Sequence, residues 1–187
     1  MKVNYYNYLV LLLLFTVLLF SCRNNIRDQD KKPVTIDEET LISTNKYIIQ
    51  KEVERIGNYV ERRGWDMDTT KSGLWYKIIK RGTGPDAVEG KIVTIEYEIS
   101  LLDGTICYSS EQTGLKQFAI GSGGVESGLE EGILLLNEGA EAIFILPPYL
   151  AYGIPGDQKK IPPNTSLVYN LKLKKVEERW NDGTIER

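Results

Sequence analysis

"LPPYLAYGIPGDQKKIPPNTSLVYNLKL", residues 146–173, combines two proline pairs, a tyrosine between alanine and glycine, and a final alternating apolar run. The first pair, 147–148, ends the preceding strand because proline lacks the N–H that a sheet requires. Gly153 permits a tight turn, and the second pair, 162–163, fixes the far end of the loop. The stretch therefore predicts a rigid connection between two strands that presents Tyr152, either as a plain turn or as the wall of a binding site.

The sequence around this stretch alternates with a period of two. Strands are predicted in the segments 73–82, 91–105, 116–121, 139–148 and 166–177, because apolar and polar residues alternate there and turn residues separate them. One short helix is predicted in "VESGLEEGILLL", residues 125–136, from its apolar spacing of three and four. A single helix covers only one face of a sheet, so the sheet should curl around it. The predicted class is α+β, an antiparallel half-barrel sheet wrapped on one short helix.

A second helix is predicted before the strands. Acidic residues at 37–39 suit a helix start, and Gly64 suits a left-handed end. One apolar stripe runs along it, made of Ile42, Ile49, Val53, Ile56 and Val60. Such a stripe usually packs on its own domain, and a homodimer through the 37–63 helix is the alternative.

The first residues have the pattern of a targeting segment. An apolar run from Leu9 to Phe20 is shorter than the ~20 residues that a membrane-spanning helix needs, and it has the length of a secretory signal. "LFSC" follows and resembles a bacterial lipobox, in which cleavage precedes a cysteine that then carries lipid. We therefore expect a lipoprotein signal peptide at 1–21 and lipid attachment at Cys22; an uncleaved anchor helix is the alternative. The polar segment 22–36 is predicted to be a tether.

Composition excludes several kinds of chemistry. The chain of 187 residues has a net charge of −3 and a pI of about 5.2, so no basic field exists to attract nucleic acid. It contains no histidine, which excludes Ser-His triads, histidine acid–base catalysis and most zinc sites. We expect neither a cofactor nor a metal. If Cys22 carries lipid, Cys107 is the only free thiol.

Four segments together resemble the FKBP-type peptidyl-prolyl isomerases: "LDGTICYSS", "GVESGLEEGILLL", "NEGAEAIFILPPYLAYG" and "IPPNTSLVYNLKL". They stand in the order and spacing of that family, and the lipobox, tether and helix before them resemble the lipoprotein members of gliding bacteria. The resemblance implies an isomerase domain at 71–178, preceded by a helical extension at 37–70 and followed by a tail at 179–187. It also implies an activity that needs no nucleophile or metal, only a pocket that favours the twisted amide of an X–Pro bond.

The resemblance assigns roles position by position. The implied catalytic residues are Tyr152, Tyr97 and Glu126, the last through its backbone N–H, which in the family binds a substrate carbonyl. The implied substrate-binding residues are Cys107, Tyr108, Phe118, Val125, Leu129, Ile161 and Tyr169. Tyr97 and Phe118 can also be interpreted as plain core residues, and Cys107 as a small apolar residue that lines the pocket. Asp157 is most simply a solvated charge in a turn; the alternative is that it selects the residues flanking proline.

Some positions depart from the family pattern. The pocket floor, usually tryptophan, is Leu129, and Lys116 stands where an aromatic residue is usual. Phe and Asp are common at two neighbouring positions, which here are Cys107 and Tyr108, so the acid beside the pocket is expected to be missing. Tyr169 stands in place of Phe. These departures leave the fold unaffected and bear on catalytic efficiency.

Two functions follow from this reading. The first is a prolyl isomerase that assists folding of envelope proteins by acting on their proline-containing segments. The second is an FKBP-fold chaperone or scaffold with weak or no turnover, in support of a motility or secretion apparatus. In both, the lipid anchor holds the protein at a bacterial membrane, which we expect to be the outer one, with the domain in the periplasm.

Overall fold

The computed structural model describes residues 37–178. The chain divides into two units, Met1–Ile42 and Ser43–Arg187. The helix Glu38–Arg62 begins in the first unit, and the packing contacts described below belong to the second. The predicted signal peptide, Cys22, the tether and the tail at 179–187 lie outside the described residues. Within residues 37–178, no helix is both long and apolar enough to cross a membrane.

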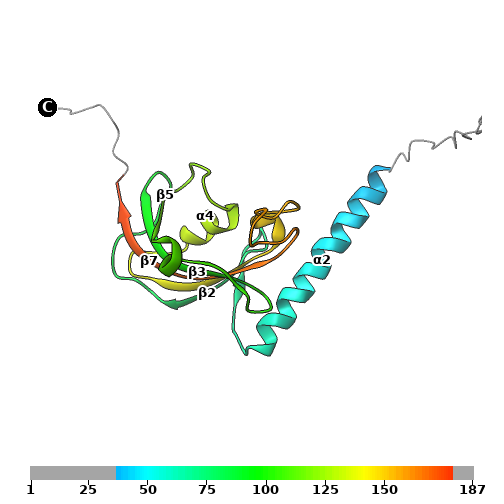
Figure 1. Ribbon diagram of the computed structural model, residues 1–187, viewed down its shortest axis with the longest axis horizontal. Coiled ribbons are helices and arrows are strands. Elements are labelled where there is room, and N and C mark those ends of the chain that lie inside the picture. Colours follow the sequence, from blue (N-terminus) through cyan, green and yellow to red (C-terminus); the bar gives the residue numbers. More distant parts are fainter. Residues whose placement is uncertain (1–36, 179–187) are drawn as a thin grey trace, which may run out of the picture. The chain divides into compact units, whose positions relative to one another are not determined.

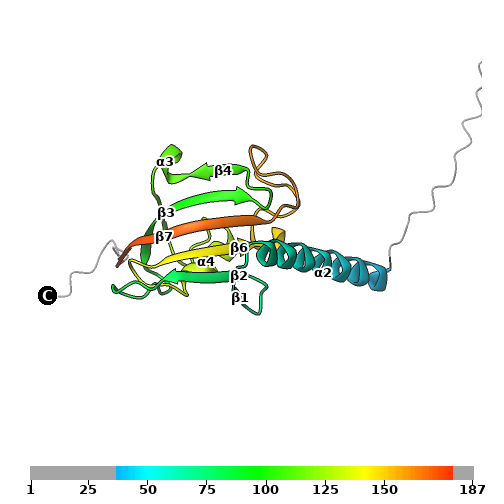
Figure 2. The ribbon, with the colours of Figure 1, turned by 90° about the horizontal axis from the view of Figure 1, so that it is seen from below.

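One antiparallel sheet of seven strands dominates the described part of the chain. The strands are β1 (Asp68–Thr69), β2 (Trp75–Lys80), β3 (Ile92–Leu101), β4 (Ile106–Ser109), β5 (Lys116–Ala119), β6 (Glu141–Leu146) and β7 (Leu167–Glu177). They are ordered β1-β2-β6-β7-β3-β4, with β5 also paired to β3, and Figure 2 shows the longer strands side by side in this order. β7 pairs along the whole length of β3, from Ile92 opposite Glu177 to Leu101 opposite Leu167.

The inner face of this sheet holds the main core. Alternate residues of β3, among them Ile95 and Ile99, point inward and are buried against Leu129 and Ile133 of α4 (Ser127–Ile133). Figure 1 shows α4 on one side of the strands. The predicted α+β fold, an antiparallel sheet around one short helix, is therefore confirmed.

Helix α4 lies very close to the sheet because two of its residues have no side chain. A Cβ added to Gly132 would lie 2.5 Å from the ring of Phe144 on β6, and one added to Gly128 would lie 2.7 Å from Leu146. Real Cβ atoms do not approach other atoms so closely, so both positions require glycine. This close packing fixes where the start of α4 meets the sheet.

The outer face of the sheet is covered at one end by α2 (Glu38–Arg62). Ile56, Tyr59 and Val60 are buried against Ile143, Ile145 and Val168 of β6 and β7. Gly64 ends this segment with φ of +60°, as predicted. The apolar stripe packs on the domain only through its last two members; Ile49 and Val53 are 46% and 45% exposed, and Ile42 is also exposed.

The short elements were not predicted. They are β1, β4, α3 (Ser110–Thr113) and the 3-10 turn η1 (Pro148–Leu150). None exceeds four residues, which is too short for a periodic pattern to show.

Candidate functional site

The start of α4, the inner face of the sheet and the 151–164 loop together form the candidate site. The implied pocket residues all belong to, or pack against, one apolar cluster, except Glu126. Its buried members are Tyr97, Cys107, Leu129, Ile161 and Tyr169, and its partly buried members are Tyr108, Phe118, Val125 and Tyr152. The fold therefore brings into one cluster residues that are far apart in the sequence: Tyr97 and Tyr169 are separated by 72 positions.

Tyr152 is held at the mouth of this cluster by a tightly bonded loop. The N–H of Gly153 donates to the carbonyl of Pro148 at 2.8 Å, and the N–H of Asn164 donates to the carbonyl of Gly153 at 2.9 Å. Burial, and then the neighbouring Glu126 carboxylate, raise the pKa of Tyr152 well above its ordinary value. The hydroxyl is therefore a proton-bearing donor across the physiological pH range.

Asp157 organises the far side of the same loop. Its Oδ1 accepts from the N–H groups of Ile161 at 2.7 Å and Lys159 at 2.9 Å, and its Oδ2 accepts from the Tyr108 hydroxyl. Burial raises the pKa of Asp157, but these hydrogen bonds outweigh it and hold the pKa below its usual value. Asp157 is thus more than a solvated turn charge, and an acid does stand beside Tyr108, supplied by a different segment from the one expected.

Tyr97 presents its ring rather than a free hydroxyl. Thr113 donates its only hydroxyl proton to the carbonyl of Ser109 at 2.9 Å, so in the 2.8 Å contact between Tyr97 and Thr113 the Tyr97 hydroxyl is the donor. The Lys116 ammonium lies 5.4 Å from the centre of the Tyr97 ring, within range of a cation–π contact. Tyr97 is thereby fixed as a wall of the site.

Glu126 is the buried charge of the site, at the N-terminal end of α4. Its Oε1 accepts from the Tyr169 hydroxyl at 2.8 Å, and its Oε2 lies 3.8 Å from Lys116 Nζ and has no hydrogen bond within the described residues. Burial first, and then this carboxylate, raise the pKa of Tyr169 well above its ordinary value. Among residues 37–178, the backbone N–H of Glu126 finds no acceptor.

A hollow of about 270 Å³ opens above these groups. It is lined by Lys116, Gly123, Gly124, Val125, Glu126, Ala151 and Tyr152. Sequence reasoning identified Glu126 only through its backbone N–H, and it did not identify the two glycines or Ala151. The unpaired N–H and the unsatisfied Oε2 belong to the same residue, and Val125 and Ala151 supply apolar lining beside it.

Cys107 is a packing residue in this arrangement. It is 1% exposed, and burial raises the pKa of its thiol, which keeps it in the unreactive protonated form. In the described part of the chain, no group of three or more His, Cys, Asp or Glu side chains is placed to hold a metal ion.

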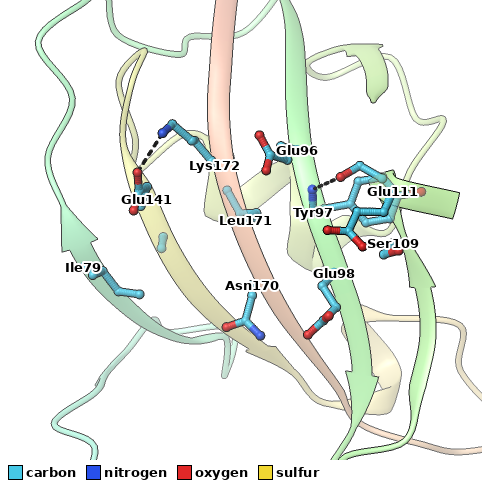
Figure 3. Close-up of a pocket in the computed structure, with 12 residues that line it drawn as sticks. Ile79, Glu96, Tyr97, Glu98, Ser109, Glu111, Glu141, Asn170, Leu171 and Lys172 are labelled. Atoms are coloured by element: carbon cyan, nitrogen blue, oxygen red, sulfur yellow. Dashed lines mark hydrogen bonds and ion pairs between the residues drawn. The ribbon is translucent and has the colours of Figure 1, made fainter. Parts of the chain in front are cut away.

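A second hollow, of about 430 Å³, lies on the opposite face of the sheet. Figure 3 shows Glu96 on β3 across from Lys172 on β7, and Glu98 across from Asn170. Lys172 contacts Glu141 at 2.9 Å, and Lys174 contacts Glu96 at 3.3 Å. This hollow is a charged, solvated surface, unlike the apolar pocket on the inner face.

Comparison with known proteins agrees with the geometry of the inner face. The family model for FKBP-type peptidyl-prolyl cis-trans isomerases matches residues 84–174. FK506-binding protein 2 of Yarrowia lipolytica is 35% identical over 112 residues, which cover 59% of this chain and 76% of that protein. The chain belongs to the FKBP-type peptidyl-prolyl cis-trans isomerase family.

Two bacterial relatives extend the comparison. The probable FKBP-type isomerase FkpA of Neisseria meningitidis serogroup B is 46% identical over 109 residues, 58% of this chain but only 39% of that protein. The crystal structure of FkpA from Escherichia coli superposes with a TM-score of 0.59 over 95% of this chain and 84% of that one. At 24% identity this superposition shows the fold alone. It covers more of the chain than the FKBP domain.

Proposed function

We propose that the protein is a peptidyl-prolyl cis–trans isomerase that acts on proline-containing segments of envelope proteins. The observation that carries the proposal is the unpaired N–H of Glu126, a residue that directly precedes α4 and lines the same hollow as Tyr152. A substrate carbonyl would accept from this N–H while its proline ring contacts the apolar floor.

Isomerisation of an X–Pro bond needs no nucleophile or metal. Rotation about an X–Pro bond has a barrier of about 18–20 kcal/mol because amide resonance must be broken. An apolar surface favours the less polar twisted amide, and donors placed to meet its carbonyl oxygen stabilise it further. In this proposal Val125, Phe118 and Ile161 enclose the proline ring, and Tyr152 donates to the substrate.

The decisive test is catalysis by the full-length chain, solubilised in mild detergent, of cis–trans exchange in a short X–Pro peptide. We expect acceleration above the uncatalysed rate. Tyr152→Phe should lower kcat/KM by about tenfold, the loss of one hydrogen bond of ~1.5 kcal/mol, without changing the unfolding midpoint. Tyr149→Phe, in the preceding η1 turn and 46% exposed, is the matched control and should retain the native rate. A folded protein without any acceleration would refute the proposal.

A second candidate function is a chaperone or scaffold that holds a segment without turnover. It is favoured by an apolar groove of about 470 Å³ between α2 and the loop of the site, lined in part by Ile48, Ile49, Tyr149 and Ile154. If holding is the function, Tyr152→Phe should still suppress aggregation of an unfolded protein, whereas an isomerase-dependent effect should fall with kcat/KM.

The groove also bears on the oligomeric state. The exposed Tyr47, Ile49 and Val53 of α2 are available for a homodimer through the 37–63 helix. Sedimentation of the native chain and of Val53→Glu tests this: a dimer that dissociates in the variant supports it, and a native monomer refutes it.

The anchor is proposed on the sequence of the first 22 residues. Lipid attachment at Cys22 would hold the domain within tether reach of the outer membrane, on its periplasmic side. Labelling of growing cells with a radioactive fatty acid should mark the native protein and not Cys22→Ser, and fractionation of the two membranes tests the site.

A further inference from the structure

Three polar residues meet in the pocket where an apolar lining would suffice. Lys116 on β5, Glu126 before α4 and Tyr169 on β7 come from separate segments. Tyr169 is fully buried and donates to Glu126 Oε1 at 2.8 Å, while Lys116 Nζ stands 3.8 Å from Oε2. They therefore act as one cluster around a single carboxylate.

The two oxygens of this carboxylate are treated differently. Oε1 accepts from the buried Tyr169 hydroxyl, and the Tyr152 hydroxyl also interacts with this carboxylate. Oε2 has no hydrogen bond within the described residues, because the 3.8 Å to Lys116 Nζ is beyond the 2.7–3.2 Å of a hydrogen bond from nitrogen. The Glu126 side chain is only 4% exposed, so solvent does not replace the missing donor. A buried acceptor without a donor is unfavourable, and it is an observation that requires an explanation.

The position of Oε2 suggests what its partner is. Glu126 lines the 270 Å³ hollow at the mouth of the pocket, and its unoccupied N–H belongs to the same residue. Oε2 itself has almost no exposed surface, so a peptide whose carbonyl accepts from this N–H reaches Oε2 only when the neighbouring Lys116 ammonium moves away. A carboxylate only accepts hydrogen bonds, so the partner must be a donor or a cation.

We propose that the Glu126 carboxylate sets the sequence preference of the site: it selects proline segments with a hydrogen-bond donor or positive charge beside the proline, and it rejects those with a carboxylate there. The inference rests on the proposed isomerase function and names the substrate class of that same site. Glu126 is then a specificity residue through its side chain, separate from the role of its backbone N–H.

Lys116 acts as the removable counter-charge of this residue. Its side chain is 27% exposed, and its ammonium contacts Tyr97 and Glu126 without a hydrogen bond to either. A four-carbon stem lets the ammonium move into solvent when a substrate donor arrives. Lys116→Met should therefore sharpen the preference for a cationic substrate, because the competing charge is gone.

The purely structural alternative is that Glu126 only anchors Tyr169. Glu126→Gln separates the two roles, since the amide oxygen still accepts from Tyr169 while the negative charge is lost. Glu131→Gln is the matched control: Glu131 lies on the same helix, but its Oε2 accepts from Ser72 at 2.6 Å, away from the hollow.

The test compares kcat/KM of the full-length chain on two sets of short peptides, with Lys, Leu or Glu placed before the proline in one set and after it in the other. In at least one set, the native protein should prefer Lys to Glu by about tenfold or more, the worth of one charged hydrogen bond. Glu126→Gln should bring this ratio to within about threefold of one, and Glu131→Gln should leave it unchanged.

The outcomes separate the inference from the function on which it rests. Suppose that the Leu peptides are accelerated, and that the ratio of kcat/KM for the Lys peptide to that for the Glu peptide is the same in the native protein and in Glu126→Gln. The inference is then wrong, and the proposed isomerase function stands. No acceleration of any peptide would overturn the proposed function. The same peptides would then be compared by calorimetric binding, where an equal Lys and Glu affinity overturns the inference as well.

Discussion

Tyr169→Phe removes the hydrogen bond that a fully buried hydroxyl donates to the carboxylate of Glu126. Tyr169 is 0% exposed, and its hydroxyl donates to Glu126 Oε1 at 2.8 Å. The substitution deletes one oxygen atom and changes the shape of the core very little. Its main effect is to remove the buried donor of Glu126 Oε1, so the measured loss reports on this single interaction.

The magnitude follows from the charge of the acceptor. A hydrogen bond to a charged group contributes about 1.5–3 kcal/mol, and an acceptor left unsatisfied in the interior costs about 1–3 kcal/mol. We therefore expect Tyr169→Phe to lower the free energy of unfolding by about 2 kcal/mol. For a domain of this size that corresponds to a fall of roughly 4–8 °C in Tm.

The double variant Tyr169→Phe with Glu126→Leu provides the sharper test. Replacing both partners by apolar groups is close to neutral, whereas breaking a buried pair from one side is costly. The double variant should thus be more stable than the sum of the two single changes predicts, by about 1.5–2 kcal/mol. Urea unfolding followed by tryptophan fluorescence measures all four proteins.

Additivity would refute this reasoning. If the two single losses add to within about 0.5 kcal/mol, Tyr169 and Glu126 do not interact and the cluster has no energetic meaning. Tyr76→Phe is the control for loss of a hydroxyl, because the Tyr76 hydroxyl has no hydrogen-bond partner in the described part of the chain. It should change stability by no more than about 0.5 kcal/mol.

Three further substitutions test how the site is supported. Gly132→Ala should cost about 1–2 kcal/mol in urea unfolding despite alanine's helix propensity, because the new Cβ would lie 2.5 Å from Phe144. Ile56→Ala should cost about 2–5 kcal/mol by the same measurement, because Ile56 is fully buried between α2 and the sheet. Asp157→Asn should lower Tm at neutral pH. Burial raises the Asp157 pKa, but the hydrogen bonds from Tyr108 and the loop outweigh it and lower the pKa, so the ionised carboxyl stabilises the fold. This contribution is complete above the unfolded pKa of about 3.9 and is lost as pH falls through the lower folded pKa, so the two Tm values should converge below about pH 4.

Each of these has a control and an opposing outcome. Gly124→Ala meets no atom within 4 Å and should be tolerated, so equal losses at both glycines would contradict the close-packing argument. Ile79→Ala, at a position 58% exposed, should be near neutral beside Ile56→Ala. A Tm difference at Asp157 that persists unchanged at pH 3 would show that ionisation is not what stabilises the loop.

The fold could be predicted because its signals are local and repeated. Alternation along β3 and β7 sets one inward face over the ten paired positions from Ile92 to Leu101, and the proline pairs mark where strands end. The stripe of α2 was harder to interpret. Its spacings of seven, four, three and four are helical throughout, yet Ile56 packs on the sheet and Ile49 does not, and only the position of the sheet decides where the contact stops.

The candidate site could be predicted only in part, because its polar groups are not neighbours in the sequence. Lys116, Glu126 and Tyr169 each look ordinary alone: a strand lysine, an acid before a helix and a core aromatic. The register of β5 and β7 on β3, together with the glycines that bring α4 close to β6, places Lys116 and Tyr169 around the carboxylate of Glu126. Lys116 and Tyr169, two departures from the family pattern, are therefore both partners of Glu126, and a change at any one of the three alters the environment of the other two.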